Sequence, residues 1–207
     1  MSARASDCFA DGPWQPAVLS AFDPRRLLVY HRGMSLVVLA YPDLAPADYE
    51  RIQEYRRTQD RYFHLVAPHV TLVFPVDGWT PDAFIAEIER QARGCRPFSF
   101  CLRSAVFNKD VSGTVYHCLL APDEGFGGVV RLHDRLYAGE LFPYRRLDVD
   151  FIPHVGVGNS ADPNEVLSMV DHWNRQEFAI AGRLSVLDVG VFEHDSLRTI
   201  RRIPLDG

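Results

Sequence analysis

The sequence has no long hydrophobic run, no paired cysteines and no excess of positive charge. Nothing in it approaches the roughly 18 consecutive apolar residues of a membrane-spanning helix, and its first residues lack the apolar stretch of a secretory signal peptide. The four cysteines, Cys8, Cys95, Cys101 and Cys118, include no C-x-x-C pair, so neither a zinc knuckle nor a redox motif is indicated. We therefore expect a cytoplasmic protein with reduced thiols and no membrane partner.

The charge balance limits the kinds of ligand that the protein can bind. Its 207 residues carry a formal net charge of −5 at pH 7. A broad, non-specific nucleic-acid surface needs many cations to neutralise phosphates, so the composition argues against one. It leaves room for a pocket that binds a single phosphate. Hydrophobic residues make up 47% and charged residues 24%, which is ordinary for a globular protein with a core of its own.

Residues 1–33 differ from the rest of the chain. Three prolines and a glycine interrupt their short apolar patches, and no periodicity lasts long enough to predict an element. We interpret them as an N-terminal extension that precedes one domain, residues 34–207. That domain begins at Ser35 with an apolar run of strand length, SLVVLAY.

The remaining sequence predicts strands and helices in an irregular alternation. We expect helices at 43–60, 81–93, 128–139 and from 162 onward, and strands at 64–76, 97–107, 114–122, 147–159, 178–194 and 196–205. The last two strands should meet around Asp195. Thr80 and Pro81 supply a cap and a first residue for the second helix, and Gly94 ends it. The order lacks the rhythm of a parallel sheet, which favours an α+β fold with antiparallel sheets.

The motif Pro-His-Val, followed by alternating apolar residues, occurs twice. VAPHVTLVFP spans 66–75 and FIPHVGVGN spans 151–159. Each copy is followed by a capped helix and then by a pair of strands. This likeness predicts a bilobal molecule in which two antiparallel sheets with flanking helices are related by a pseudo-two-fold axis around a central cleft.

Residues two apart in a strand point to the same face. His69 should therefore share a face with Thr71, and His154 with Gly156. Two imidazoles across a cleft suit acid–base chemistry near neutral pH, because one ring can accept a proton while the other delivers one. A hydroxyl such as that of Thr71 can donate to a phosphate oxygen.

Simpler interpretations of these histidines remain open. One histidine on an apolar strand is usually a structural residue, but packing has no need of the same polar residue in two matching contexts. For His117, whose strand could border the cleft, we expect a structural role. A histidine metal site is a further alternative, although no carboxylate or cysteine stands at ligand spacing to complete the three or four ligands usually needed.

These residues resemble the two motifs of the 2H phosphoesterase superfamily, the 2′–5′ RNA ligase-like proteins. That family carries two His-x-Thr/Ser-x motifs, and PHVTLVFP is similar to the first and FIPHVGVGN to the surroundings of the second. The resemblance covers about residues 34–207. It implies metal-independent cleavage, without a cofactor, of 2′,3′-cyclic phosphates or 2′–5′ phosphodiesters in nucleotides or short RNA. It also implies that His69 and His154 are the acid–base pair and Thr71 a phosphate ligand.

Two residues depart from the family pattern. Gly156 stands where the family has threonine or serine, and Asn159 where many members have arginine. A hydrogen bond to a charged oxygen is worth about 1.5–3 kcal/mol, so its loss could reduce rate or affinity about 10- to 150-fold. In a re-tuned site, Gly156 takes part in phosphate binding through close backbone approach or opens room for a bulkier substrate. Otherwise the chain is a non-catalytic or weakly active module that binds nucleotides or RNA ends.

Aromatic and basic residues near the motifs are candidates for contacts with bases and phosphates. Phe74, Phe107 and Tyr144 could stack on bases, and three arginines could add positive charge to the rim of the cleft: Arg103, Arg145 and Arg146.

Overall fold

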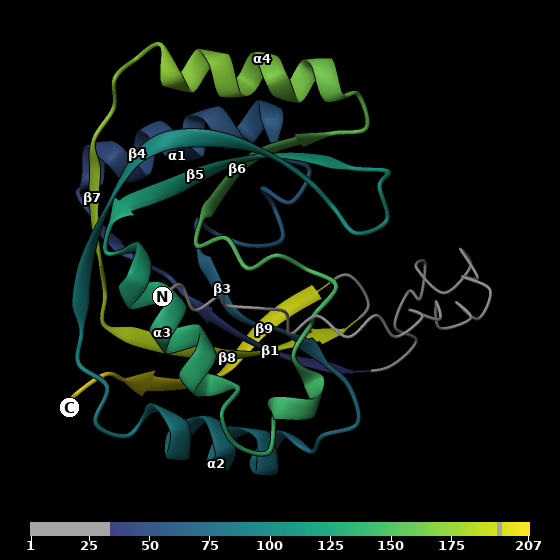
Figure 1. Ribbon diagram of the computed structural model, residues 1–207, viewed down its shortest axis with the longest axis vertical. Coiled ribbons are helices and arrows are strands. Elements are labelled where there is room, and N and C mark those ends of the chain that lie inside the picture. The colour runs from purple at the N-terminus through teal and green to yellow at the C-terminus, as the bar shows by residue number, and fades with distance from the viewer. Residues whose placement is uncertain (1–33, 194–195) are drawn as a thin grey trace, which may run out of the picture.

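The computed structural model describes residues 34–193 and 196–207. The expected N-terminal extension, 1–33, and the expected meeting point of the closing strands, 194–195, lie outside the described residues. The described chain forms two antiparallel sheets with four flanking α-helices (Figure 1). The predicted α+β class and the two antiparallel sheets are confirmed.

Each sheet draws strands from both halves of the chain. The four-stranded sheet has the order β3 (Val70–Val76), β1 (Ser35–Ala40), β8 (Val186–Glu193) and β9 (Ser196–Pro204). The five-stranded sheet has the order β2 (Asp43–Leu44), β7 (Ile180–Leu184), β4 (Phe98–Lys109), β5 (Tyr116–Glu124) and β6 (Val155–Ser160). The strands that follow the two histidines, β3 and β6, are therefore both edge strands, one in each sheet.

The helices connect the two sheets in a crossed manner. They are α1 (Pro46–Gln59), α2 (Pro81–Ala92), α3 (Phe126–Leu136) and α4 (Pro163–Asn174), with a short 3-10 helix, η2 (Phe142–Tyr144). Helix α1 precedes β3 along the chain but packs against β6, whereas α3 precedes β6 but packs against β3. Helices α2 and α4 lie on the outer sides of the molecule (Figure 1). Each histidine strand is thus held by the helix that introduces the other one.

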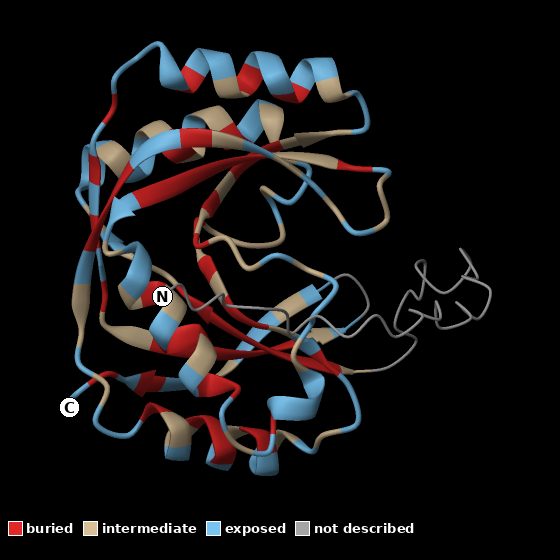
Figure 2. Cartoon of the chain, viewed as in Figure 1, coloured by how far each residue is buried: buried red, intermediate tan, exposed pale blue. Residues whose placement is uncertain are grey.

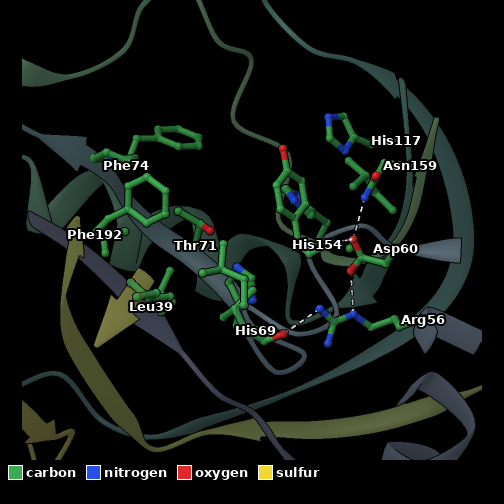
Figure 3. Close-up of a pocket in the computed structure, with 18 of the residues that line it drawn as sticks. Leu39, Arg56, Asp60, His69, Thr71, Phe74, His117, His154, Asn159 and Phe192 are labelled. Atoms are coloured by element: carbon green, nitrogen blue, oxygen red, sulfur yellow. Dashed lines mark hydrogen bonds and ion pairs between the residues drawn. The ribbon is translucent and has the colours of Figure 1, made fainter. Parts of the chain in front are cut away.

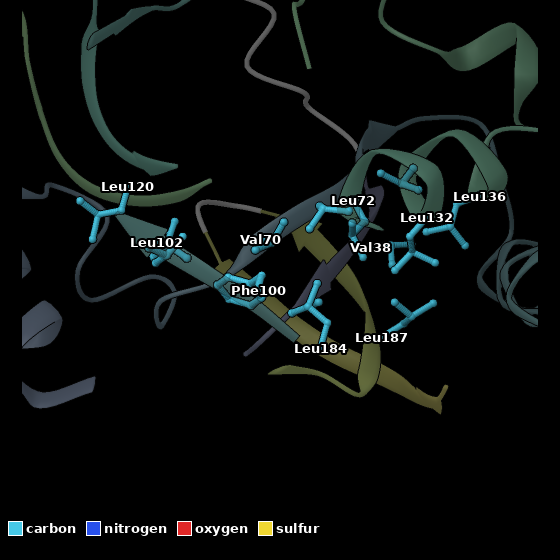
Figure 4. Packing of buried hydrophobic residues seen from close by; sticks show 14 of the residues in the cluster. Val38, Val70, Leu72, Phe100, Leu102, Leu120, Leu132, Leu136, Leu184 and Leu187 are labelled. Carbon is cyan, nitrogen blue, oxygen red and sulfur yellow. The ribbon is translucent and has the colours of Figure 1, made fainter. Parts of the chain in front are cut away.

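Buried apolar side chains from both sheets and their helices form the core (Figure 4). All six residues of β1 are buried, which explains why its sequence is apolar throughout Leu36–Ala40 rather than alternating. The expected inward residues of the histidine strands, Val70, Leu72, Val155 and Val157, are also buried. Exposed residues gather on the outer faces of the helices (Figure 2). Within the described ranges no helix is both long and apolar enough to cross a bilayer.

Two helix starts follow the predicted cap chemistry. The Thr80 hydroxyl accepts a hydrogen bond from the Ala83 amide at 3.4 Å, and the Asp162 carboxylate accepts one from the Asn164 amide at 2.8 Å. Gly94, just beyond α2, has a φ of +75°, a left-handed conformation that glycine adopts without strain.

Two predicted helices and one predicted strand are among the elements whose limits differ in the structure. The helix expected from Asp43 begins at Pro46, because Asp43–Leu44 pairs with β7 instead. The helix expected at 128–139 spans Phe126–Leu136. The single strand expected at 178–194 is two strands in different sheets, interrupted at Ser185. There the Ser185 hydroxyl donates to an Asp43 carboxylate oxygen at 2.7 Å, and the chain crosses between the sheets.

Candidate active site

A cavity of about 410 Å³ between the two sheets contains both histidine motifs (Figure 3). The four residues that the sequence singles out, His69, Thr71, His154 and Gly156, all line its wall. Strands β1, β3, β8 and β9 contribute from one sheet, and β5 and β6 from the other. The fold thus brings the two motifs together in one hollow.

Both histidines lie immediately before their strands, which corrects the predicted strands 64–76 and 147–159. Strand β3 begins at Val70, after a turn at 61–65, and β6 begins at Val155. Pro68 and Pro153 have no amide hydrogen to give to a ladder. The strand periodicity therefore starts one residue after each histidine, yet the imidazole and the residue two positions later still face the same cavity.

The two rings are fixed by the same local contact. His69 Nδ1 lies 2.9 Å from the Ala67 carbonyl oxygen, and His154 Nδ1 lies 2.5 Å from the Ile152 carbonyl oxygen. A carbonyl oxygen can only accept, so in the neutral ring each Nδ1 carries the proton and each Nε2 is left unprotonated. Residues that precede proline are restricted to extended conformations, which sets these carbonyls in the same way in both copies. This contact gives the repeated proline a physical role.

Burial keeps both rings neutral when the cavity is empty. Burial lowers the pKa of His69 to about 4, and the charges of His154 and Arg56 act in the same direction more weakly. Burial also lowers the pKa of His154, with a smaller effect from the charge of His117. Both rings line the same cavity. At neutral pH each ring presents an unprotonated Nε2.

Neither the backbone nor the packing requires glycine at position 156. The φ angle of Gly156 lies outside the left-handed range, and an added Cβ would meet only Leu119 Cδ2, at 4.0 Å. That distance is an ordinary van der Waals contact. A side chain at this position would enter the space beside His154. The site therefore has room for a threonine or serine at position 156, although it has glycine there.

A buried ion pair that the sequence analysis missed, Arg56 with Asp60, forms part of the cavity wall. Arg56, only 1% exposed, donates from Nε to Asp60 Oδ2 at 2.8 Å and from its terminal nitrogen to the Val66 carbonyl at 2.7 Å. Asp60 Oδ1 accepts from Asn159 Nδ2 at 2.6 Å (Figure 3). Asn159, at the position where arginine was expected, therefore joins β6 to the end of α1. The spacing of Arg56 and Asp60, four residues apart on a helix, was the available signal, but exposed helices show it too.

A second unpredicted support comes from α3. His133, 2% exposed, has its Nδ1 at 2.8 Å from the Leu72 carbonyl oxygen of β3. Its ring stacks on Phe151 with centroids 3.6 Å apart, and Phe151 lies three residues before His154. The Tyr137 hydroxyl accepts from the amide of Phe74 at 3.0 Å. Helix α3 thus holds β3 and the segment that leads to the second motif.

The aromatic and basic candidates are distributed unevenly. Phe74 lines the cavity, whereas Phe107 packs against Tyr116 and Tyr144 against Trp79, at centroid distances of 5.4 and 6.0 Å. All three arginines expected at the rim form ion pairs: Arg103 with Asp123, Arg145 with Asp134, and Arg146 with Asp148. Among the residues that the structure describes, no group of three or more histidine, cysteine or acidic side chains is arranged to hold a metal ion.

Comparisons with known proteins identify the family and the fold. The family model of the 2′–5′ RNA ligase superfamily matches residues 42–196. E. coli LigT in complex with 3′-AMP is similar in structure, with a TM-score of 0.52 at 16% identity, covering 84% of this chain and 99% of LigT. Kluyveromyces marxianus Usb1 is similar with a TM-score of 0.50 at 9% identity, over 84% of this chain and 99% of Usb1. A solved structure of a phosphoesterase is similar with a TM-score of 0.52 at 14% identity, over 84% of this chain and 100% of the phosphoesterase.

No curated protein matches the chain in a sequence search. The family match nevertheless covers most of the chain and includes both histidine motifs, and the structural neighbours share its arrangement of sheets and helices. The chain belongs to the 2′–5′ RNA ligase superfamily.

Proposed function

We propose that the protein is a metal-independent phosphoesterase that cleaves 2′,3′-cyclic phosphate or 2′–5′ phosphodiester bonds of nucleotides or short RNA. His69 and His154 are its acid–base pair. The observation that carries this proposal is the matched fixing of the two rings, each with Nδ1 on a backbone carbonyl and Nε2 free at the wall of one cavity.

The proposed reaction transfers one proton at each ring. A phosphate anion between the imidazoles raises their pKa values, so that one ring becomes protonated. The neutral ring takes a proton from the attacking water as its oxygen bonds to phosphorus. The protonated ring gives its proton to the ribose oxygen as that P–O bond breaks. The Thr71 hydroxyl donates to a non-bridging phosphate oxygen, and Gly156 leaves room beside the same phosphate.

The solved complexes of the structural neighbours support a nucleotide or RNA substrate. LigT has been solved with 3′-AMP, NADP+ and ATP, and Usb1 with uridine monophosphate. All of these ligands carry phosphate on a ribose. For this chain, a substrate of that kind is part of the proposal, as is the cytoplasmic location expected from the sequence.

A second candidate function is binding without chemistry. It is favoured by one observation: β6 offers the phosphate neither a hydroxyl at Gly156 nor a cation at Asn159, whose amide is engaged with Asp60. A binding module would hold a nucleotide without turnover, and restoring a hydroxyl with Gly156→Thr would not create any turnover.

Turnover of 2′,3′-cyclic nucleotides and 2′–5′ dinucleotides in excess EDTA tests the proposal. We expect His69→Ala and His154→Ala each to reduce kcat/KM at least about 100-fold, the usual range for loss of a general acid or base. His172→Ala is the matched control, because that histidine is exposed on α4 and does not line the cavity. A double variant, His69→Ala with His154→Ala, that keeps the wild-type rate would refute the assignment.

A further inference from the structure

A third histidine faces the cavity beside the acid–base pair. His117 of β5 stands directly opposite Asn159 of β6 in the strand register, and both line the cavity. In Figure 3 the two side chains lie together on one side of the acid–base pair, and Phe74, Phe192 and Leu39 lie on the other. The cavity therefore has two chemically different ends.

The end formed by His117 and Asn159 has unused hydrogen-bonding capacity. Asn159 donates to Asp60, but its Oδ1 is buried and accepts no hydrogen bond from any described residue. No described residue hydrogen-bonds to the ring of His117 either. A buried acceptor without a partner is costly. Because Asn159 Oδ1 is closed to solvent, a ligand that donates to it needs the amide to turn toward the cavity, whereas the ring of His117 lines the cavity directly.

The chemistry of this pair favours a neutral polar group over a second phosphate. Burial lowers the pKa of His117, so at neutral pH its ring offers one donor and one acceptor rather than a positive charge. The carboxylate of the neighbouring Asp60 is balanced by its ion pair with Arg56, so that pair adds no net positive charge to attract an anion. The matching ligand carries an N–H or O–H donor beside an acceptor, as the edge of a nucleobase or a ribose hydroxyl does.

The opposite end of the cavity cannot make such contacts through its side chains. It is lined by apolar residues of the four-stranded sheet: Val37, Leu39, Phe74, Phe192 and Leu197. A flat base can pack there. A phosphate with a nucleoside on only one side would occupy one end of the cavity, whereas a phosphodiester that joins two nucleosides would reach both.

We propose that His117 and Asn159 form a hydrogen-bonding subsite for the second nucleoside of a phosphodiester substrate. The subsite rests on the proposed phosphoesterase function and adds a substrate class to it. It favours esters that join two nucleosides over cyclic or alkyl phosphates. His117 and Asn159 are specificity residues in this scheme, and the proton transfers stay with His69 and His154.

The test compares two substrates that differ only on the far side of the phosphate. One is adenylyl-(2′–5′)-adenosine, and the other is adenosine 2′-(methyl phosphate), in which a methyl group replaces the second nucleoside. We expect His117→Phe to lower kcat/KM for the dinucleotide about tenfold, the effect of losing one or two hydrogen bonds. The methyl ester should change less than about twofold, since its methyl group makes no hydrogen bond at the subsite. His117→Gln keeps a donor and an acceptor and should restore most of the dinucleotide rate.

A dinucleotide whose second nucleoside lacks its base shows whether the subsite binds the edge of the base or a ribose hydroxyl. Sensitivity to His117→Phe that persists with this substrate assigns the subsite to a ribose hydroxyl, and sensitivity that disappears assigns it to the base. Equal losses on the dinucleotide and the methyl ester would overturn the proposal, because His117 would then act on the shared chemistry near His154. No loss on either substrate would overturn it as well.

Failure of the proposed function can be told apart from failure of the subsite. If the wild-type protein turns over none of these esters, the phosphoesterase proposal fails. Calorimetric binding of the dinucleotide then tests the subsite alone: we expect His117→Phe to weaken binding about tenfold relative to wild type. Equal affinities, or no binding by the wild type, would overturn the subsite too.

Discussion

Gly156→Thr should strengthen catalysis without disturbing the fold. The cavity has room for the new side chain, because an added Cβ meets only Leu119 Cδ2 at 4.0 Å. The backbone at this position needs no left-handed φ. Threonine also suits a strand better than glycine, by up to about 1 kcal/mol. We therefore expect the melting temperature to stay the same or to rise.

The size of the catalytic gain follows from one added hydrogen bond. The threonine hydroxyl would stand two residues after His154, as Thr71 stands two residues after His69. A hydrogen bond to a charged phosphate oxygen is worth about 1.5–3 kcal/mol, which corresponds to about 10- to 150-fold in kcat/KM. We expect the lower part of that range, because in the proposed site the Thr71 hydroxyl already supplies one donor to the phosphate.

The assay is steady-state turnover of the best wild-type substrate by three variants. Gly156→Val has the shape of threonine without the hydroxyl and should give no gain. Thr71→Val removes the existing hydroxyl and should reduce kcat/KM by a factor similar to the gain from Gly156→Thr. A folded Gly156→Thr protein that is no faster than Gly156→Val would show that position 156 does not face the reacting phosphate. Positions 71 and 156 would then not be equivalent.

Burial of the histidines predicts two pH effects, and the buried ion pair predicts a third result. Because the pKa of His69 is lowered to about 4 and that of His154 is also lowered, the free protein carries a protonated ring mainly at acid pH. We therefore expect kcat/KM to peak below pH 6.5 and to fall above it. A peak above pH 7.5 would contradict this prediction. A histidine in the unfolded chain has a pKa near 6.5, whereas folded His69 has a pKa of about 4. The free energy of unfolding should therefore be highest above pH 6.5 and fall by at most about 3 kcal/mol as the pH drops to about 4. Urea unfolding at the two pH values measures this difference, which should shrink in His69→Gln. Asp60→Asn leaves the Arg56 charge buried without its partner, so the free energy of unfolding should fall by about 3 kcal/mol, and a loss under about 1 kcal/mol in urea titration would contradict that ion pair.

The features predicted well from sequence are those set by neighbouring residues. The caps at Thr80 and Asp162, the apolar run that starts at Ser35 and the pairing of each histidine with the residue two positions later depend on a few adjacent side chains. The first histidine strand begins later than the sequence predicts, because the turn at 61–65 before it contains aromatic and apolar residues that resemble a strand.

The supports of the site depend on contacts between distant segments and left no local pattern to read. Asp60 and Asn159 are 99 positions apart, and the contact of His133 with Leu72 joins residues separated by 61. His133 lies on the buried face of α3, where a polar residue looks like an interruption of the apolar stripe. Only the crossed packing, with α1 on β6 and α3 on β3, shows what these residues do.

The way the rings are fixed bears on the choice between catalysis and simple binding. A phosphate carries lone pairs, so a protein that only holds one needs donors. In this cavity the Nδ1–H of each neutral imidazole donates a hydrogen bond to a backbone carbonyl, so the ring presents only an acceptor, Nε2, to a ligand. Neither ring can donate to the anion until it takes up a proton. In the proposed site, binding of phosphate would therefore be coupled to protonation of one ring, and the other would remain unprotonated. That pair of states is what acid–base cleavage requires, whereas a binding module would gain nothing from two matched bases.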